Sequence, residues 1–266
     1  MCIDTKFDII IQGGQSNAEG LGVGPVETEI LPLVSENIFY LESEKTVEHL
    51  PESVKITFKN VPFMISPARE RGSKEEPVGD FALSFASLYE KELLQNGDRK
   101  ILIVRAAVGG TGFVKGQWGL QDQLYLKMLE MTDYALSLNK DNRVVGFLWH
   151  QGECDAFEKN DPSVFENQLT TMIQNVRNRY GEKLPFVAGD FVNEWKEKNI
   201  LNCRPIVEKI QGVVREAGDS AFVQTSDLLS NNQRVQNGDD IHFCREALYI
   251  LGQRYFEAFK EICLKR

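Results

Sequence analysis

The amino-acid sequence predicts a three-layer α/β/α fold with a central, mainly parallel β-sheet. Short and almost continuous apolar runs, rich in β-branched residues, are typical of strands that are buried on both faces of such a sheet. Longer stretches with the spacing of amphipathic helices lie between these runs, so strand and helix alternate along the chain. A length of 266 residues is sufficient for one domain of this kind.

The predicted elements follow one another in a regular order. The strands are FDIIIQG (7–13), KILIVRAA (100–107), RVVGFLWH (143–150), LPFVAGDF (184–191) and AFVQTSD (221–227). Helical spacing is found at 79–97, 120–138 and 162–180, and near 204–217 and 244–264. This alternation predicts right-handed crossovers between parallel strands.

Residues 20–78 fit the alternation poorly. Glycine, proline and charged residues interrupt shorter apolar runs there, such as NIFYL and VKITFKNV. We expect an irregular excursion with one or two short strands. Because no linker separates two large blocks, we predict that residues 1–266 form a single domain.

The composition excludes several classes of protein. The chain is 42% hydrophobic and 26% charged, as in an ordinary globular protein. Its formal charge of -9 argues against a nucleic-acid partner, which would require clustered Lys and Arg. No apolar run is long enough to span a membrane, so we expect no membrane partner.

Cysteine usage and the N-terminus favour a reducing compartment. The five cysteines are widely spaced and contain no C-x-x-C pair, which indicates neither a disulfide framework nor a zinc cluster. No basic segment followed by a long apolar run appears at the N-terminus, so we expect a cytoplasmic protein. The sequence also lacks H-E-x-x-H and a dinucleotide or phosphate loop, and we expect no metal and no cofactor.

Polar or glycine-rich segments follow three of the predicted strands: GGQSN (13–17), VGGTG (108–112) and HQGE (150–153). Ligands of open α/β sheets bind at the carboxyl ends of strands, so these loops are expected to meet. The segment GDDIHF (238–243), just before the last helical pattern, supplies a fourth element. Together they predict a catalytic site at one edge of the sheet.

The four segments contain the groups that covalent ester hydrolysis requires. Ser16 lies in a glycine-flanked turn and is the candidate nucleophile. Asp239 and His242 are three residues apart and share a face of a helical turn, so Asp239 rather than Asp240 is predicted to orient the imidazole.

Donors for the developing oxyanion are also present. Gly109 or Gly110 can bring a backbone N–H close to the substrate. Gln151 can add a side-chain amide. Further candidates for lining the site are Gln15, Asn17, His150 and Glu153.

The blocks GGQSNAEG, AAVGGTGF, LWHQGECDA and DDIHF resemble, in this order, the four signature blocks of the SGNH hydrolases. They are most similar to the branch of sialate O-acetylesterases and of acetylxylan esterases of carbohydrate esterase family 6. The stretch PVGDFALSFASLYEKEL from Pro77 also resembles a helix of this family, and the resemblance extends from residue 7 to 243. It implies a flavodoxin-like three-layer fold and an esterase that removes acetyl groups from a carbohydrate.

The resemblance also implies a role for each matched position. Ser16 is similar to the family's nucleophile, whose own N–H forms part of the oxyanion hole, and Asp239 and His242 match the acid and base. Gly110, or its neighbour Gly109, and Gln151 match the other oxyanion donors. The sequence has GQSN where lipase-like members carry GDSL, and Gln151 where many carry Asn. Both departures point to the carbohydrate-esterase branch.

Simpler interpretations exist for these residues. A serine in a glycine-rich turn is often only a turn residue or helix cap. Gln151 can satisfy backbone groups at a strand end, and Glu153 can cap the following segment. We expect His150 to be a structural hydrogen-bonding group and His49 to lie on the surface.

The function class also has alternatives. The expected substrate is a small-molecule or oligosaccharide acetyl ester, such as O-acetylated sialic acid or acetylated xylan fragments, although a non-carbohydrate ester also fits. A carbohydrate-binding protein that has lost turnover is the alternative from another class. Three aromatic residues can line a sugar pocket but are more often core: Phe113, Trp118 and Trp149. The sequence leaves open whether the chain forms a homo-oligomer.

Overall fold

The computed structural model describes residues 5–32, 35–50, 53–94 and 97–265. Its central sheet contains seven strands: β1 (Lys6–Gly14), β2 (Ile38–Glu42), β5 (Met64–Pro67), β8 (Arg99–Arg105), β9 (Arg143–His150), β10 (Phe186–Gly189) and β11 (Ser220–Val223). The main helices are α2 (Phe81–Leu93), α3 (Gln123–Ser137), α5 (Pro162–Tyr180), α7 (Ile200–Glu216) and α9 (Arg245–Leu264). Shorter helices are α1 (Ser16–Glu19), α4 (Glu153–Phe157), α6 (Asn193–Lys198), α8 (Asn231–Val235) and the 3-10 turn η1 (Thr28–Ile30).

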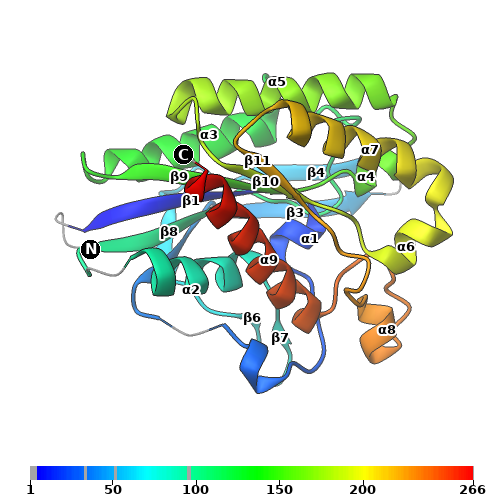
Figure 1. Ribbon diagram of the computed structural model, residues 1–266, viewed down its shortest axis with the longest axis horizontal. Helices are drawn as coiled ribbons and strands as arrows, with labels where there is room; N and C mark the ends of the chain where they lie inside the picture. The colour runs from blue at the N-terminus through cyan, green and yellow to red at the C-terminus, as the bar shows by residue number, and fades with distance from the viewer. Residues whose placement is uncertain (1–4, 33–34, 51–52, 95–96, 266) are drawn as a thin grey trace.

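The sheet separates two layers of helices. Its strand order is β11-β10-β9-β1-β8-β2-β5, and all neighbours pair in parallel except β5, which is antiparallel to β2. Helices α3, α5 and α7 cover one face, and α2 and α9 cover the other (Figure 1). The predicted three-layer α/β architecture is confirmed.

Burial on both faces explains why β1 is so apolar. Every residue of β1 from Phe7 to Gly14 is buried. Phe7 and Ile9 pack in a cluster with Met131 of α3, whereas the hydrophobic contacts of Ile10 belong to the main core. A strand that is covered on both faces cannot alternate apolar with polar residues, which is why it appears as a continuous run.

The strand order places a crevice at the carboxyl end of β1. β8 pairs with one edge of β1, and β9 pairs with the opposite edge. The chain therefore crosses over β1 in the segment that connects β8 to β9. The loops after β8 and β9 therefore leave on opposite sides of the loop after β1. Such a switch point is where open α/β sheets bind ligands.

The excursion at 20–78 contains more strands than the one or two expected. Besides β2 and β5 of the central sheet, it forms a hairpin of β3 (Lys45–Leu50) with β4 (Ser53–Phe58), and a small pair of β6 (Arg71–Gly72) with β7 (Pro77–Val78). Strand β4 alternates between half-buried and exposed residues, and β3 does so at its start and is exposed at its end. Their apolar residues are therefore too sparse to give the signal of a buried strand.

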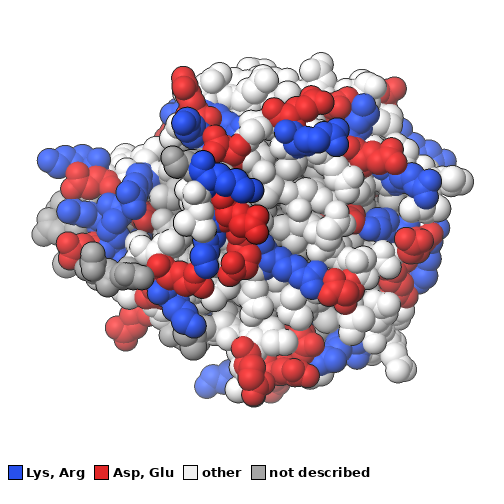
Figure 2. All heavy atoms as spheres, in the orientation of Figure 1, with Lys and Arg blue, Asp and Glu red and all other residues white. Residues whose placement is uncertain are grey.

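The visible surface has no concentration of positive charge. On the face that Figure 2 shows, acidic and basic side chains are interspersed and form no broad basic patch. Of the helices within the described residues, none combines the length and the apolar character needed to cross a membrane.

Candidate active site

Ser16 is the first residue of α1, directly after β1. Gly14 has a φ of 127°, and a Cβ at this position would lie 2.1 Å from the carbonyl oxygen of His150. Only glycine tolerates such an approach. The Gln15 N–H donates to the same His150 oxygen, and the Val108 N–H donates to the Gly14 carbonyl. The turn that presents Ser16 is therefore fixed to the chain at the ends of both β9 and β8.

His242 and Asp239 meet in the loop before α9. His242 Nδ1 lies 2.9 Å from each carboxylate oxygen of Asp239. Burial alone would raise the pKa of Asp239, but hydrogen bonds from His242 and Asn231 favour the carboxylate and hold the pKa below its ordinary value. Asp240 instead contacts Lys198 Nζ at 2.9 Å. Asp239 is therefore the carboxylate that the structure places on the imidazole.

Asn231 orients this pair, and the sequence analysis missed it. Its Nδ2 donates to Asp239 Oδ2 at 2.9 Å, and its backbone N–H donates to the His242 carbonyl at 2.8 Å. Ser230 and Gln233 form a capping box that starts α8 at this residue. The pattern S-x-x-Q could have predicted the start of the helix, although not the contact with Asp239.

Asn17 ties the nucleophile turn to the loop that carries His242. Its Nδ2 donates to the Ile241 carbonyl at 3.0 Å, and its Oδ1 accepts from the Phe243 N–H at 3.0 Å. The residues on either side of His242 are thus held by the residue next to Ser16. This double contact fixes the distance between the two halves of the site.

The two glycines of the second block have different partners. The Gly109 N–H donates to Glu19 Oε2 at 2.8 Å. Gly110 has a φ of 71°, and its N–H donates to no other group within the described part of the chain. Of the two backbone donors left open by the sequence, Gly110 is therefore the one with a free N–H.

Gln151 is buried and joins three loops. Its Nε2 donates to Asp155 Oδ2 at 2.5 Å and lies 3.3 Å from the Thr111 carbonyl and 3.4 Å from Gln15 Oε1. With its amide engaged in this way, Gln151 has a structural role in the present geometry, and its expected role as an oxyanion donor stays a prediction. Gln15 lines a cavity together with Ser16 and His242, and its Oε1 accepts from the Cys154 N–H at 3.0 Å.

His150 and Glu153 form a buried pair behind the site. His150 Nε2 lies 3.7 Å from Glu153 Oε1, and both side chains are fully buried. Burial lowers the pKa of His150 to about 3, so the imidazole is neutral at physiological pH. Burial also raises the pKa of Glu153, although a hydrogen bond from Asn17 opposes this. His150 Nδ1 lies 3.0 Å from the Tyr255 hydroxyl, which supports the structural role expected for this histidine.

Ser16 and His242 line one cavity of about 520 Å³, together with Gly109 and Gly110. The loops after three strands and the loop before α9 therefore do meet. His49 also lines this cavity from the β3/β4 hairpin, and a Cβ at Gly110 would lie 3.5 Å from its ring. His49 is exposed, as expected, but it belongs to the wall of the site rather than to a remote surface.

Several neighbouring groups have other roles. Phe113, Trp118 and Trp149 are core residues, with at most 2% of their surface exposed. Cys154 lines the cavity, and burial raises its pKa to about 12, so it is a neutral thiol. In the part of the chain that the structure describes, no group of three or more His, Cys, Asp or Glu side chains is arranged to hold a metal ion.

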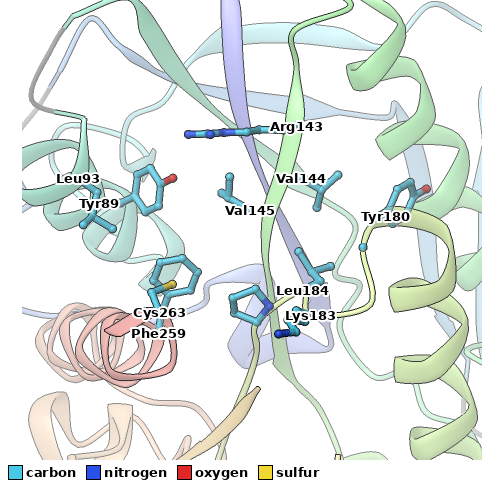
Figure 3. Close-up of a pocket in the computed structure, with 12 residues that line it drawn as sticks. Tyr89, Leu93, Arg143, Val144, Val145, Tyr180, Lys183, Leu184, Phe259 and Cys263 are labelled. Atoms are coloured by element: carbon cyan, nitrogen blue, oxygen red, sulfur yellow. The ribbon is translucent and has the colours of Figure 1, made fainter. Parts of the chain in front are cut away.

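A second cavity, of about 380 Å³, lies at the start of β9, and Figure 3 shows the residues that line it. Val144 and Val145, near the start of β9, line it together with Phe259 of α9. Arg143 also lines it and donates from Nε to the buried Asp8 carboxylate at 2.7 Å. Its described lining contains neither serine nor histidine. The cavity that Ser16 and His242 line together is the candidate active site.

A family model described as a carbohydrate esterase, sialic acid-specific acetylesterase, matches residues 6–261. A probable 9-O-acetyl-N-acetylneuraminic acid deacetylase from Escherichia coli (strain K12) is 26% identical over 121 residues. That match covers 36% of this chain and 37% of the relative, so the chain covers little more than a third of that relative's length.

Solved structures share the fold over most of the chain. The structure of NanS has a TM-score of 0.76 at 20% identity, with complete coverage of both chains. A protein from Arabidopsis thaliana has a TM-score of 0.65 at 18% identity, covering 96% of this chain and 98% of its own. A carbohydrate acetylesterase from Xanthomonas citri has a TM-score of 0.61 at 17% identity, covering 97% of this chain and 57% of its own.

Proposed function

Because the chain belongs to the sialic acid-specific acetylesterase family of carbohydrate esterases, we propose that it hydrolyses acetyl esters of a sugar through an acyl-enzyme on Ser16. The observation that carries this proposal is the 2.9 Å contact between His242 and Asp239 at a cavity that Ser16 also lines. A nucleophile, a base and an orienting acid are the minimum set for this chemistry.

The proposed reaction proceeds in two steps. His242 accepts the proton of the Ser16 hydroxyl as the oxygen attacks the acetyl carbonyl, and Asp239 stabilises the imidazolium that forms. The N–H groups of Ser16 and Gly110 stabilise the negative charge on the carbonyl oxygen. His242 then gives its proton to the departing sugar oxygen, and a water molecule activated by the same histidine releases acetate.

Two sites can supply a third donor to the oxyanion. Gln15 lines the cavity, and its Oε1 accepts from the Cys154 N–H, whereas its Nε2 donates to no group among the described residues. Gln151 would have to leave Asp155 before it could donate. We therefore place Gln15 ahead of Gln151 as the side-chain donor.

We propose an O-acetylated sialic acid as the substrate. The family description and the name of the Escherichia coli relative support this choice. Acetylated xylan fragments are the comparison substrate, since they present an acetyl ester on a neutral sugar.

The test is acetate release from both substrates by the wild type, Ser16→Ala and the control Ser137→Ala. Ser137 lies at the exposed end of α3, far along the chain from the site. Ser16→Ala should lower the rate by roughly a thousandfold or more, because nucleophile and base act as a unit. Saturable sugar binding without acetate release by the wild type would instead support the catalytically inactive binding protein.

A further inference from the structure

We infer that Lys115, Phe157 and Glu158 form a subsite for the sugar part of the substrate, in which Lys115 recognises a carboxylate. All three residues line the same cavity as Ser16 and His242. This inference rests on the proposed function and extends it from the ester to the remainder of the substrate. The ligand class is an acidic sugar with an acetyl ester.

Phe157 provides an apolar surface at the mouth of the cavity. It is the last residue of α4, and 68% of its surface is exposed. A large aromatic residue gains nothing for folding from such exposure. At the wall of a cavity, however, its face can pack against the C–H groups of a sugar ring, as aromatic residues in ligand sites commonly do.

Lys115 supplies the positive charge. Among the described residues that line the cavity, it is the one lysine or arginine, and its side chain is 21% exposed. Its Nζ lies 3.0 Å from Glu158 Oε1. The pair presents a donor and an acceptor side by side, which suits the carboxylate and hydroxyl groups of one acidic sugar.

The backbone that carries Lys115 is firmly held. The N–H groups of Phe113 and Val114 donate to Asp155 at 3.1 and 2.9 Å, and the Gly116 N–H donates to the Phe113 carbonyl at 2.9 Å. The lysine is therefore presented from a fixed turn, on the segment that follows the oxyanion loop. A fixed cation costs less ordering on binding than a mobile one.

The remaining charges make Lys115 decisive for an anionic ligand. Glu19, Glu153 and Glu158 also line the cavity, so without Lys115 its lining would contain carboxyl groups and no lysine or arginine, beside the imidazoles of His49 and His242. Like charges in a partly desolvated site repel, so the acceptance of an acid depends on this one cation. A neutral sugar has no such dependence.

The experiment compares 9-O-acetyl-N-acetylneuraminic acid with its C1 methyl ester, which removes the charge and keeps the acetyl group. Acetate release is measured with the wild type, Lys115→Met, Lys115→Arg, Glu158→Gln and Phe157→Ala. The control is Lys260→Met, which removes an ion-paired lysine of α9 that does not line the cavity. Thermal melting confirms that each variant is folded.

Lys115→Met should raise KM for the acid about ten- to a hundredfold relative to the methyl ester, as expected for the loss of a charged hydrogen bond. Lys115→Arg should recover much of this preference. Glu158→Gln should strengthen the preference for the acid, because the lysine is released from its partner. Phe157→Ala should raise KM for both substrates alike, and Lys260→Met should behave as the wild type.

Equal KM values for acid and methyl ester in the wild type would overturn the inference, as would an unchanged ratio in Lys115→Met. If Lys115→Met fails to fold, a wild-type KM for the acid that does not rise with salt would overturn it as well. Hydrolysis of 4-nitrophenyl acetate but of neither sugar would reject the subsite and leave the esterase intact. Loss of the proposed function itself would appear as no turnover of any ester.

Discussion

Glu19 connects the turn that carries Ser16 to the loop that carries Gly109 and Gly110. Its carboxylate accepts the Gly109 N–H at 2.8 Å, and its own N–H donates to the Gln15 carbonyl. Its carbonyl accepts from Arg105 at 2.6 Å and from Arg71 at 3.0 Å. Glu19 thus occupies the N–H of Gly109, whereas the N–H of Gly110 donates to no group among the described residues.

Glu19→Ala should therefore lower kcat about ten- to a hundredfold with a smaller change in KM, because a misplaced donor acts mainly on the transition state. Glu19→Gln keeps an oxygen acceptor for Gly109 and should recover most of the rate. Steady-state kinetics on 4-nitrophenyl acetate measure both. Equal defects in the two variants would show that the charge of Glu19, and not its position, matters.

The contrast between Asp239 and Asp240 gives a second test. Asp239→Asn should lower kcat about a thousand- to ten-thousandfold, because the imidazole loses both its orientation and the stabilisation of its charged form. Asp240→Asn removes only a contact with Lys198 and should stay close to wild type. The rates of both variants should be measured at the same pH. Reversed defects would refute the assignment of the orienting acid.

Local pairs in the site could be predicted from the sequence, and distant ones could not. Asp239 and His242 are three residues apart and make the expected contact, although residues 239–242 form a loop and not the helical turn from which the contact was predicted. Glu19 reaches Gly109 across 90 residues, and Asn17 reaches Phe243 across 226. Because no periodicity links such positions, only the folded chain identifies these supporting residues.

At the scale of elements, the turn between β1 and α1 positions Ser16, the proposed nucleophile. The strands of the central sheet other than β2 and β5 were predicted because their apolar runs are continuous. The long helices were predicted because their amphipathic spacing extends over many residues: α2, α3, α5, α7 and α9. The short helices α4, α6 and α8 contain at most six residues and were missed. Such helices depend on caps and tertiary contacts more than on a periodic pattern.

Gly14→Ala should destabilise the protein by about 2–4 kcal/mol and abolish most of the activity, since the new Cβ would collide with a backbone oxygen at the end of β9. Gly116→Ala is the matched control. Gly116 has a φ of 63°, but its Cβ would meet no atom within 4 Å, so the cost should be about 1 kcal/mol of backbone strain. Urea unfolding and the esterase rate measure both effects. A Gly14→Ala protein as active and stable as the control would show that the turn can relax.

At the scale of the whole molecule, the buried His150 ties stability to pH. Its folded pKa of about 3 lies below the ordinary value of 6.5, so the unfolded chain binds a proton first as the pH falls. The stability that this neutral histidine contributes is complete above pH 6.5 and is lost between about 6.5 and 3. The contribution of Glu153 to stability changes with pH in the opposite direction. Its pKa is raised in the folded protein, so its contribution favours the folded state more as the pH falls.

Between pH 7 and pH 5, His150 should account for about 2 kcal/mol of lost unfolding free energy. The measurement is urea unfolding at both pH values for the wild type and His150→Gln. The variant is expected to be less stable at pH 7 but to lose about 2 kcal/mol less on acidification. The same loss in both proteins would mean that the pKa of His150 in the folded protein is not lowered.

The most direct test of the account is to trap the acyl-enzyme. The wild-type protein is mixed with an excess of 4-nitrophenyl acetate, quenched in acid within the first turnovers and digested, and the peptides are analysed by mass spectrometry. We expect one acetyl group on the peptide that carries Ser16, at the serine itself, and none on that peptide in Ser16→Ala. Turnover by Ser16→Ala at the wild-type rate, or an acetyl group that forms and decays at catalytic rate on another residue, would contradict the assignment of Ser16 as the nucleophile.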